Sequence, residues 1–213
     1  MQPRTVISKL VAVVALLLCG VSFSAQAQDL PTYQNEAMGI TLTCPEGWFL
    51  VSGDKVQQAL NKNISDMSTV ESVKEAYKKL GILVVFSKYP FGSPREFNPN
   101  MALTSEQIDP QYAELVKAPL DIANAGIVSM KVMFKDAQVV EQPSLVSVAG
   151  RECAHYVYEA TSVRGYLEQR LKCSIYIFVK DGIVYTLSFT DSVADFDADL
   201  AAFQYSVNSI KFQ

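Results

Sequence analysis

The sequence contains one histidine, His155, in 213 residues. A hydrolase built on Ser-His-Asp or Cys-His chemistry would have to use it as the base. Neither a Gly-x-Ser-x-Gly elbow nor a recognisable cysteine-nucleophile motif accompanies it. Gly-rich phosphate loops and dinucleotide fingerprints are also missing. We therefore expect a protein that is not an enzyme and has no cofactor, with His155 a hydrogen-bonded or half-exposed strand residue.

The sequence has fewer basic than acidic residues. The 18 Lys and Arg residues are outnumbered by 22 Asp and Glu, which gives a formal net charge of −4. A mildly acidic protein is a poor general binder of nucleic acid and of anionic membranes. We expect no nucleic-acid partner.

Long apolar runs are missing except at the N-terminus. Arg4 and Lys9 precede an apolar stretch at residues 10–21, and Ala25-Gln26-Ala27 follows as a small-x-small cleavage site. This order is typical of a secretory signal peptide, with cleavage expected after Ala27. The apolar stretch is too short for a membrane-spanning helix, which needs about 20 residues, so we expect no transmembrane anchor.

The predicted mature chain, residues 28–213, has the length of a single domain. It would be periplasmic or secreted, and the sequence leaves its oligomeric state open, with a monomer allowed. A lipid-bearing cysteine would have to be Cys19, but Leu18 stands where a small residue is usual. We therefore favour cleavage over lipidation.

Three cysteines remain after this cleavage: Cys44, Cys153 and Cys173. Strand alternation predicts Cys153 and His155 on one face, and a hairpin turning near residues 164–165 would bring Cys173 toward Cys153. A Cys153–Cys173 disulfide is therefore allowed, beside the alternative of buried unpaired thiols. Adding Cys44 and His155 gives the ligand count of a structural zinc site, but the Cys-x-x-Cys spacing of such sites is missing, so we expect no metal.

Four aspartates are concentrated near the C-terminus: Asp191, Asp195, Asp197 and Asp199. A calcium loop would need glycine at its sixth position and glutamate at its twelfth, and both are missing. Acidic side chains in the first turn of a helix interact favourably with its dipole, which explains the cluster without a ligand.

Hydrophobic periodicity and turn residues predict strands that are joined directly by hairpins, with Asp181-Gly182 as the strongest hairpin signal. Strands are expected at 32–36, 39–44, 48–51, 82–86, 101–108, 138–141, 145–148, 151–162, 167–179 and 184–190. Helices are expected from 55 onward, at 69–80, at 119–134, and from 191 or 192 to 210. This order indicates an α+β fold with a mostly antiparallel central sheet flanked by helices.

Three stretches resemble the PsbP/Mog-like superfamily. They are residues 33–48, which end in Pro45-Glu-Gly-Trp48; Asn98-Pro-Asn-Met101; and the C-terminal part, with Gly150-Arg-Glu, Val179-Lys-Asp-Gly and Asn208-Ser-Ile-Lys-Phe212. The resemblance implies an α/β/α sandwich. Members include photosystem accessory subunits, Ran-binding partners and bacterial envelope proteins, and the chain is most similar to the exported bacterial branch. The superfamily has no fixed catalytic set to carry over.

The loop at residues 89–97 is the most distinctive predicted surface feature. It combines Tyr89, Phe91, Phe97 and Arg95 with two prolines that stiffen it. Aromatic residues and arginine suit a contact site for a partner, although Phe91 and Phe97 could instead pack under the sheet edge.

The sequence therefore predicts an exported, non-enzymatic accessory or adaptor protein of the bacterial envelope. It would bind another envelope protein through this loop or a sheet edge. The alternative is a carrier of a small apolar ligand or lipid, in a pocket between sheet and helices.

Overall fold

The computed structural model describes residues 31–58, 81–90, 93, 97–108, 118–134, 136–164 and 167–213. The predicted signal peptide, the helix expected at 69–80, and the loop residues Phe91 and Arg95 lie outside these ranges. The elements are β1 (Thr32–Asn35), β2 (Ile40–Thr43), β3 (Phe49–Ser52), β4 (Gly81–Ser87), β5 (Asn100–Gln107), α4 (Pro119–Met133), β6 (Gln138–Val148), β7 (Arg151–Arg164), β8 (Leu167–Lys180), β9 (Ile183–Ser192), α5 (Phe196–Ser209) and β10 (Lys211–Phe212). Residues 53–58 are also helical.

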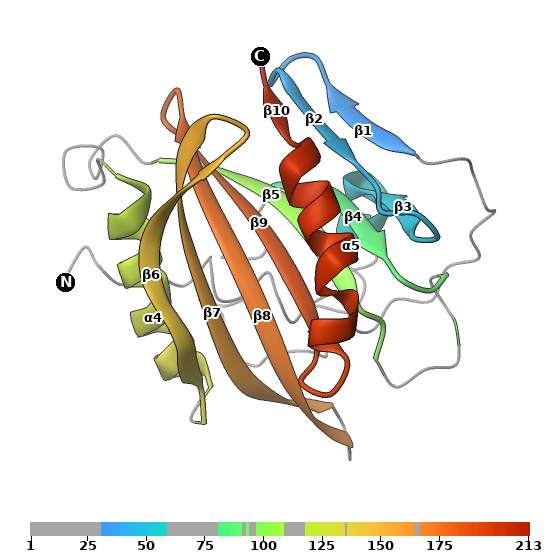
Figure 1. Ribbon diagram of the computed structural model, residues 1–213, viewed down its shortest axis with the longest axis vertical. Coiled ribbons are helices and arrows are strands. Elements are labelled where there is room, and N and C mark those ends of the chain that lie inside the picture. The colour runs from blue at the N-terminus through green and yellow to red at the C-terminus, as the bar shows by residue number, and fades with distance from the viewer. Residues whose placement is uncertain are drawn as a thin grey trace.

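A seven-stranded sheet in the order β3-β4-β5-β9-β8-β7-β6 forms the centre of the molecule (Figure 1). Every strand pair in it is antiparallel. Asp181 and Gly182, which join β8 to β9, have φ angles of 53° and 74°. Positive φ at both central residues is the geometry of a type I′ hairpin turn, which Asp-Gly favours. The predicted hairpin and antiparallel sheet are confirmed.

The two faces of this sheet are covered by different helices. One face packs against α5 and β2 through side chains that include Phe189, Phe203 and Leu42. The opposite face packs against α4, with Ile122 and Met130 of the helix against Tyr156 of β7. In Figure 1, α5 lies in front of the sheet and α4 behind it. The result is the expected α+β sandwich.

Helix α4 occupies almost the range that the sequence predicts. Pro119 is its first residue, a position at which a backbone N–H would have no acceptor within the helix. Asp121 Oδ2 accepts a hydrogen bond from the Ala118 backbone N–H at 3.2 Å, which caps the first turn. None of the helices in the described ranges is long and apolar enough to cross a membrane.

Helix α5 begins later than predicted, because β9 continues to Ser192. Ser192 Oγ donates to Asp195 Oδ2 at 2.8 Å and accepts from the Asp195 backbone N–H at 3.1 Å. This reciprocal contact builds a turn between strand and helix, so the helix starts at Phe196. The predicted apolar stripe is confirmed where Phe196, Phe203 and Val207 are buried.

Strand β6 is continuous, whereas the sequence predicts two strands separated at residues 142–144. Its pairing with β7 shifts register between Val139 and Glu141 and again between Glu141 and Ser144. Pro143 lies within the second irregularity. A proline is tolerated there because β6 is an edge strand with a neighbour on one side only.

A second sheet in the order β1-β2-β10 lies beside α5 (Figure 1). Strand β10 was not predicted, since two residues are too few to show an alternating pattern. It pairs with β2 through Lys211 opposite Thr41 and Phe212 opposite Ile40. The Gln213 backbone N–H donates to Gly39 O at 2.6 Å and extends the contact to the β1–β2 turn.

Candidate functional site

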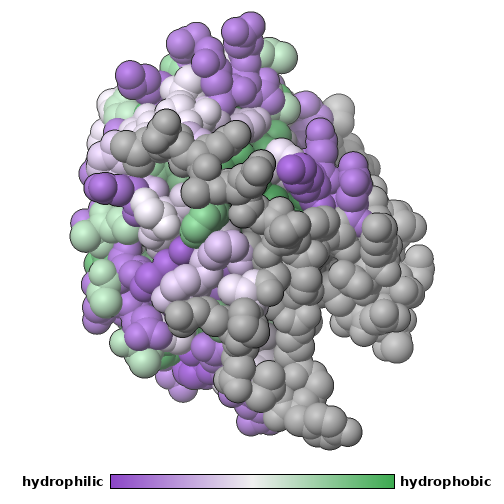
Figure 2. Space-filling view, turned by 90° about the vertical axis from the view of Figure 1, so that its right-hand side faces the viewer, coloured by the Kyte–Doolittle hydropathy of each residue, from purple (hydrophilic) through white to green (hydrophobic). Residues whose placement is uncertain are grey.

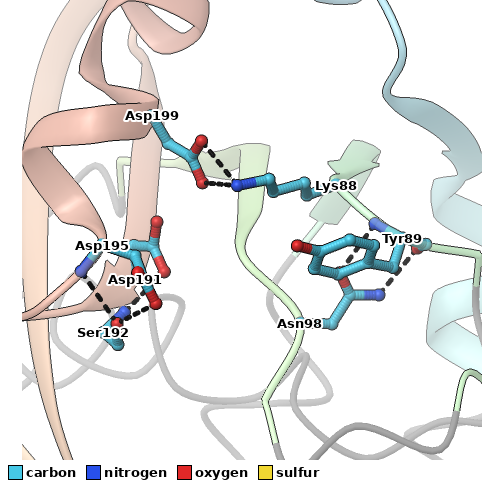
Figure 3. A network of polar contacts seen from close by, with 7 residues as sticks. All are labelled: Lys88, Tyr89, Asn98, Asp191, Ser192, Asp195 and Asp199. Atoms are coloured by element: carbon cyan, nitrogen blue, oxygen red, sulfur yellow. Dashed lines mark hydrogen bonds and ion pairs between the residues drawn. The ribbon is translucent and has the colours of Figure 1, made fainter.

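The loop between β4 and β5 is closed at its base by one side chain, Asn98. Its Oδ1 accepts from the Tyr89 backbone N–H at 3.0 Å, and its Nδ2 donates to Tyr89 O at 2.7 Å. We call these two hydrogen bonds the Asn98 clamp (Figure 3). The Lys88 backbone N–H also donates to Pro99 O at 2.9 Å. Both ends of the loop are therefore fixed to each other by backbone contacts as well as by the amide.

Lys88 connects this loop base to the first turn of α5. Its Nζ lies 2.7 Å from both Asp199 carboxylate oxygens and 5.7 Å from the centre of the Tyr89 ring. Burial disfavours the charged lysine, but the hydrogen bond and charge of Asp199 outweigh it, so the pKa of Lys88 is raised. The ammonium thus stays charged and holds the loop base on the helix.

Asp191, at the end of β9, lies beside this ion pair and is fully buried. Its Oδ1 accepts from the Ser192 backbone N–H at 2.6 Å, while its Oδ2 has no hydrogen-bond partner in the described part of the chain. Burial, and after it the neighbouring Asp199 carboxylate, raise the pKa of Asp191 to about 7. The two carboxyl groups together therefore carry less than two negative charges near neutral pH.

The four aspartates considered as calcium ligands contact protein groups instead, and two of them, Asp191 and Asp195, contact Ser192. Asp199 binds Lys88, Asp195 binds Ser192, and Asp197 Oδ1 lies 3.2 Å from Lys172 Nζ. Within the described ranges, no three metal-ligating side chains are grouped so that they could hold an ion. The cluster is a protein network.

His155 is the centre of a second polar cluster, on the α5 side of the sheet. Its Nε2 lies 2.9 Å from Ser174 Oγ, its Nδ1 lies 3.7 Å from Glu141 Oε2, and its ring lies 4.3 Å from that of Tyr176. Burial lowers the pKa of His155, and Glu141 raises it in part, so the ring is neutral at pH 7. The prediction of a hydrogen-bonded strand histidine is confirmed.

Sequence reasoning did not find Ser174 and Glu141, because they lie on the strands either side of His155. The order of serine, histidine and carboxylate resembles that of a hydrolase. However, Ser174 is only 2% exposed, and it lies in an interior strand between Val157 and Phe189. The strand is paired on both sides at Ser174, so the described backbone groups there take part in the sheet.

The two cysteines for which the sequence allows a disulfide lie on opposite faces of the sheet. Cys153 packs on the α5 side, and Cys173 packs on the α4 side, opposite Tyr158. Cys44, Cys153 and Cys173 are all buried free thiols. The Cys153–Cys173 bond is thus not formed, because the β7–β8 register differs from the one it would need. Because Cys173 faces α4, it is also separated from Cys44 and Cys153, which were considered with it as zinc ligands.

Of the predicted contact residues, the structure describes Tyr89 and Phe97. Tyr89 is partly exposed, whereas Phe97 is buried at 9% exposure, as the alternative interpretation of the loop expects. Tyr89 is therefore the described contact candidate. Elsewhere in the described part of the chain, the exposed large apolar side chains are Val128, Val140, Leu145, Val193 and Tyr205. On the side that Figure 2 shows, most coloured atoms are hydrophilic or intermediate, and apolar ones form small areas.

No protein-family model matches the sequence, and no curated protein matches it either. Among solved structures, the cyanobacterial PsbP protein CyanoP of Synechocystis sp. PCC 6803 has 14% identity, a TM-score of 0.50, and coverage of 91% of this chain and 98% of its own. The Ran-binding protein Mog1p of Saccharomyces cerevisiae has 9% identity, a TM-score of 0.47 and coverages of 87% and 96%. The Mycobacterium tuberculosis protein LpqN, involved in cell envelope biogenesis, has 11% identity, a TM-score of 0.42 and coverages of 82% and 83%.

The similarity to CyanoP extends over nearly the whole of both chains, and at this identity it concerns the fold alone. The chain therefore has the PsbP/Mog-like fold.

Proposed function

We propose that this chain is an exported, non-enzymatic accessory protein of the bacterial envelope, which binds another protein through the 89–97 loop. The observation that carries the proposal is the double attachment of the loop base. The Asn98 clamp joins the two ends of the loop, and the Lys88–Asp199 pair fixes them to α5. Attachment of this kind at both ends of a connecting segment suits a contact site.

The attachment matters for affinity because binding orders the groups at an interface. Fixing a loop before the partner arrives removes part of that entropic cost. Tyr89 is a residue type that often contributes strongly to protein–protein contacts, since its ring is large and its hydroxyl can donate and accept. Its partly exposed position beside Lys88 suits this use.

Charge around the loop base favours a basic partner surface. Asp195 and Asp197 are exposed at the start of α5, and the Asp197 side chain is 82% exposed. Opposite charge across an interface accelerates encounter and sets orientation more than it raises affinity. A partner with lysines or arginines opposite α5 would be recognised in this way.

The non-enzymatic part of the proposal is supported by the His155 cluster. Its serine is buried within an interior strand, where the described residues leave little access for a substrate carbonyl. The cluster acts as a polar bridge between β6, β7 and β8.

Site-specific photo-crosslinking in the exporting bacterium tests the proposal. A benzoylphenylalanine residue at Tyr89 should give a discrete cross-linked product, and the same group at the exposed Tyr205 of α5 should not. Asn98→Ala should weaken the product, while Asn208→Ala, an exposed change on α5, should leave it unchanged. A product that forms equally at both tyrosines, or one that N98A does not alter, would contradict the proposed loop contact.

Export is tested separately by N-terminal sequencing of the protein recovered from the envelope fraction. We expect the mature chain to begin at Gln28. A protein that retains residues 1–27 and stays in the cytoplasm would contradict the export part of the proposal.

A further inference from the structure

Two buried carboxyl groups lie beside a single cation at the base of the 89–97 loop. Lys88 Nζ lies 2.7 Å from both carboxylate oxygens of Asp199, whose side chain is 11% exposed. Asp191 lies next to this pair, at the end of β9, and is 0% exposed (Figure 3). The three side chains come from the ends of β4 and β9 and from α5. Their charges therefore act at the point where the loop base meets the helix.

The charged groups around Asp191 come from both sides of its strand. Lys88 follows β4, Asp199 lies in α5, and Asp195 immediately precedes that helix; each interacts with the Asp191 charge. On β8, Lys172 lies directly opposite Asp191 in the strand register. Its Nζ, however, pairs with a different aspartate of α5, at 3.2 Å. Within the described ranges, Lys88 is therefore the cation that must serve both Asp191 and Asp199.

One cation neutralises one carboxylate, so the site is neutral only when it also holds a proton. Asp191 Oδ1 accepts from the Ser192 backbone N–H at 2.6 Å, and the Lys88 ammonium pairs with Asp199. A fully buried carboxylate without a counter-charge is strongly disfavoured. Burial, and after it the contact with Asp199, accordingly raise the pKa of Asp191 to about 7. Once this proton is lost, two carboxylates compete for Lys88.

We propose that these three residues make the attachment of the loop base to α5 depend on pH. While one proton is held by the two carboxyl groups, Lys88 binds Asp199 alone and the attachment is closed. Loss of that proton adds a negative charge that repels Asp199 and attracts Lys88, so the attachment opens more often. The closed form binds the proton more tightly, and its advantage is therefore lost as pH rises toward 7. The loop base is attached most firmly at mildly acidic pH.

The consequence for binding rests on the function proposed above. A loop that is fixed before its partner arrives loses less conformational entropy when it binds. If the loop is the contact site, affinity for the partner should fall as pH rises from 5 to 8. The attachment itself needs no partner, so it can be measured on the protein alone.

Hydrogen exchange read by NMR between pH 5 and 8 tests the attachment. The Lys88 backbone N–H donates to Pro99 O, and the Asp199 backbone N–H donates to Asp195 O. Their protection factors, corrected for the intrinsic pH dependence of exchange, report opening of the loop base and of the first helical turn. In the wild type, both should fall about tenfold or more from pH 5 to pH 8.

Two aspartate variants show which group is responsible. Asp191→Asn is neutral and of nearly the same size, so the protection of the two amides should change little between pH 5 and pH 8. Asp197→Asn alters an exposed aspartate of the same helical turn and should keep the wild-type pH dependence. His155 is present in all three proteins, so its own titration cancels in the comparison.

Carboxyl-carbon NMR of the wild type provides a second measurement that does not depend on the folding of D191N. The Asp191 carboxyl carbon should titrate over the same pH range in which the loop base loses protection. The proposal is overturned if wild-type protection is the same at pH 5 and pH 8, if D191N loses as much protection as the wild type, or if the Asp191 carboxyl group does not titrate in this range.

The photo-cross-link from position 89 then tests the consequence for binding. In envelope fractions, the wild-type product should be weaker at pH 8 than at pH 5, whereas the D191N product should be equally strong at both. Equal wild-type products at both pH values would overturn this consequence. If no product forms at either pH while the exchange results hold, the proposed loop contact is wrong and the pH-dependent attachment is supported.

Discussion

Lys88 Nζ binds both carboxylate oxygens of Asp199 at 2.7 Å, although the two residues are 111 positions apart in the chain. The pair joins the end of β4 to the first turn of α5 beside the buried Asp191. It therefore couples the base of the 89–97 loop to the helix that covers one face of the sheet.

Removing the lysine tests this coupling. Lys88→Met should lower the free energy of unfolding by about 1–2 kcal/mol, because Asp199 is then left beside Asp191 without its cation. The value is moderate because about a third of the Lys88 side chain is exposed. Urea denaturation measures it. Lys88→Met with Asp199→Asn should lose less than the two single changes added together, and Asp197→Asn, at an exposed pair, should change little.

Asp191 makes stability depend on pH with a definite sign. Its pKa rises from 3.8 to about 7 on folding, so the folded state binds the proton more tightly. This contribution to stability is fully present below about pH 4 and is lost as pH rises through 7. Asp191→Asn should therefore be more stable than the wild type at pH 8, by about 2 kcal/mol, and the difference should shrink toward pH 5.

His155 changes stability in the opposite direction, since its pKa is lowered on folding. Its contribution is present above pH 6.5 and is lost as pH falls through the folded-state value. The effect of His155 cancels in the difference between the melting temperatures of wild type and D191N at the same pH, because both proteins contain His155. A difference that stays constant from pH 5 to 8 would contradict the assignment to Asp191.

The Asn98 clamp should be visible in amide exchange. Asn98→Ala removes both contacts with Tyr89, so the Tyr89 amide should exchange about tenfold faster or more, as expected for loss of about 1–2 kcal/mol of local stability. Asn98→Asp keeps an acceptor for that N–H but cannot donate to Tyr89 O. The exchange rate of its Tyr89 amide should therefore lie between those of the wild type and Asn98→Ala. Hydrogen exchange read by NMR gives both values; equal protection in all three proteins would show that the clamp does not hold the loop.

Gly53 has no room for a side chain. A Cβ at this position would lie 1.7 Å from Ile82 O of β4, next to the irregular pairing between Ile82 and Val84. Gly53→Ala should therefore destabilise the protein by about 3 kcal/mol or more, since the obstacle is backbone. Gly150→Ala is the comparison: its φ of +77° disfavours alanine, but no atom lies within 4 Å, so about 1 kcal/mol is expected. If chemical denaturation shows that Gly150→Ala lowers the free energy of unfolding more than Gly53→Ala does, this packing is contradicted.

The three thiols should be unreactive in the folded protein. Burial raises the pKa values of Cys44 and Cys153 to about 12 and that of Cys173 to about 11, so little thiolate forms at pH 8. A thiol reagent should modify none of these three in buffer and all three in denaturant. A mature protein two hydrogens lighter than its reduced mass would contradict the free-thiol arrangement.

Local signals in the sequence predicted most of the fold. Pro119 marked the start of α4, and Asp181-Gly182 marked the hairpin between β8 and β9, because a fixed φ and a positive φ are properties of single residues. The apolar run 82–86 indicated an interior strand, and β4 indeed has a neighbour on each side.

Features that depend on distant residues could not be predicted in this way. The residues around Lys88 and Asp199 do not indicate that the two form an ion pair. Strand β10 is recognised as a strand only through its pairing with β2. The separation of Cys153 from Cys173 depends on the β7–β8 register, which the sequence constrained through one turn only. For the same reason the cluster of His155 with Ser174 and Glu141 emerged only from the paired strands.

The small sheet also sets an order of events for a chain whose N-terminal part becomes available first. Strand β2 pairs with β10, and the Thr43 backbone N–H donates to Ser209 Oγ across 166 residues. These contacts cannot form until the C-terminal part of the chain has emerged, whereas each long hairpin of the large sheet can close as soon as its own strands are available. We therefore expect closure of the β1-β2-β10 sheet to be a late folding step, and until it occurs one edge of β2 lacks its partner strand.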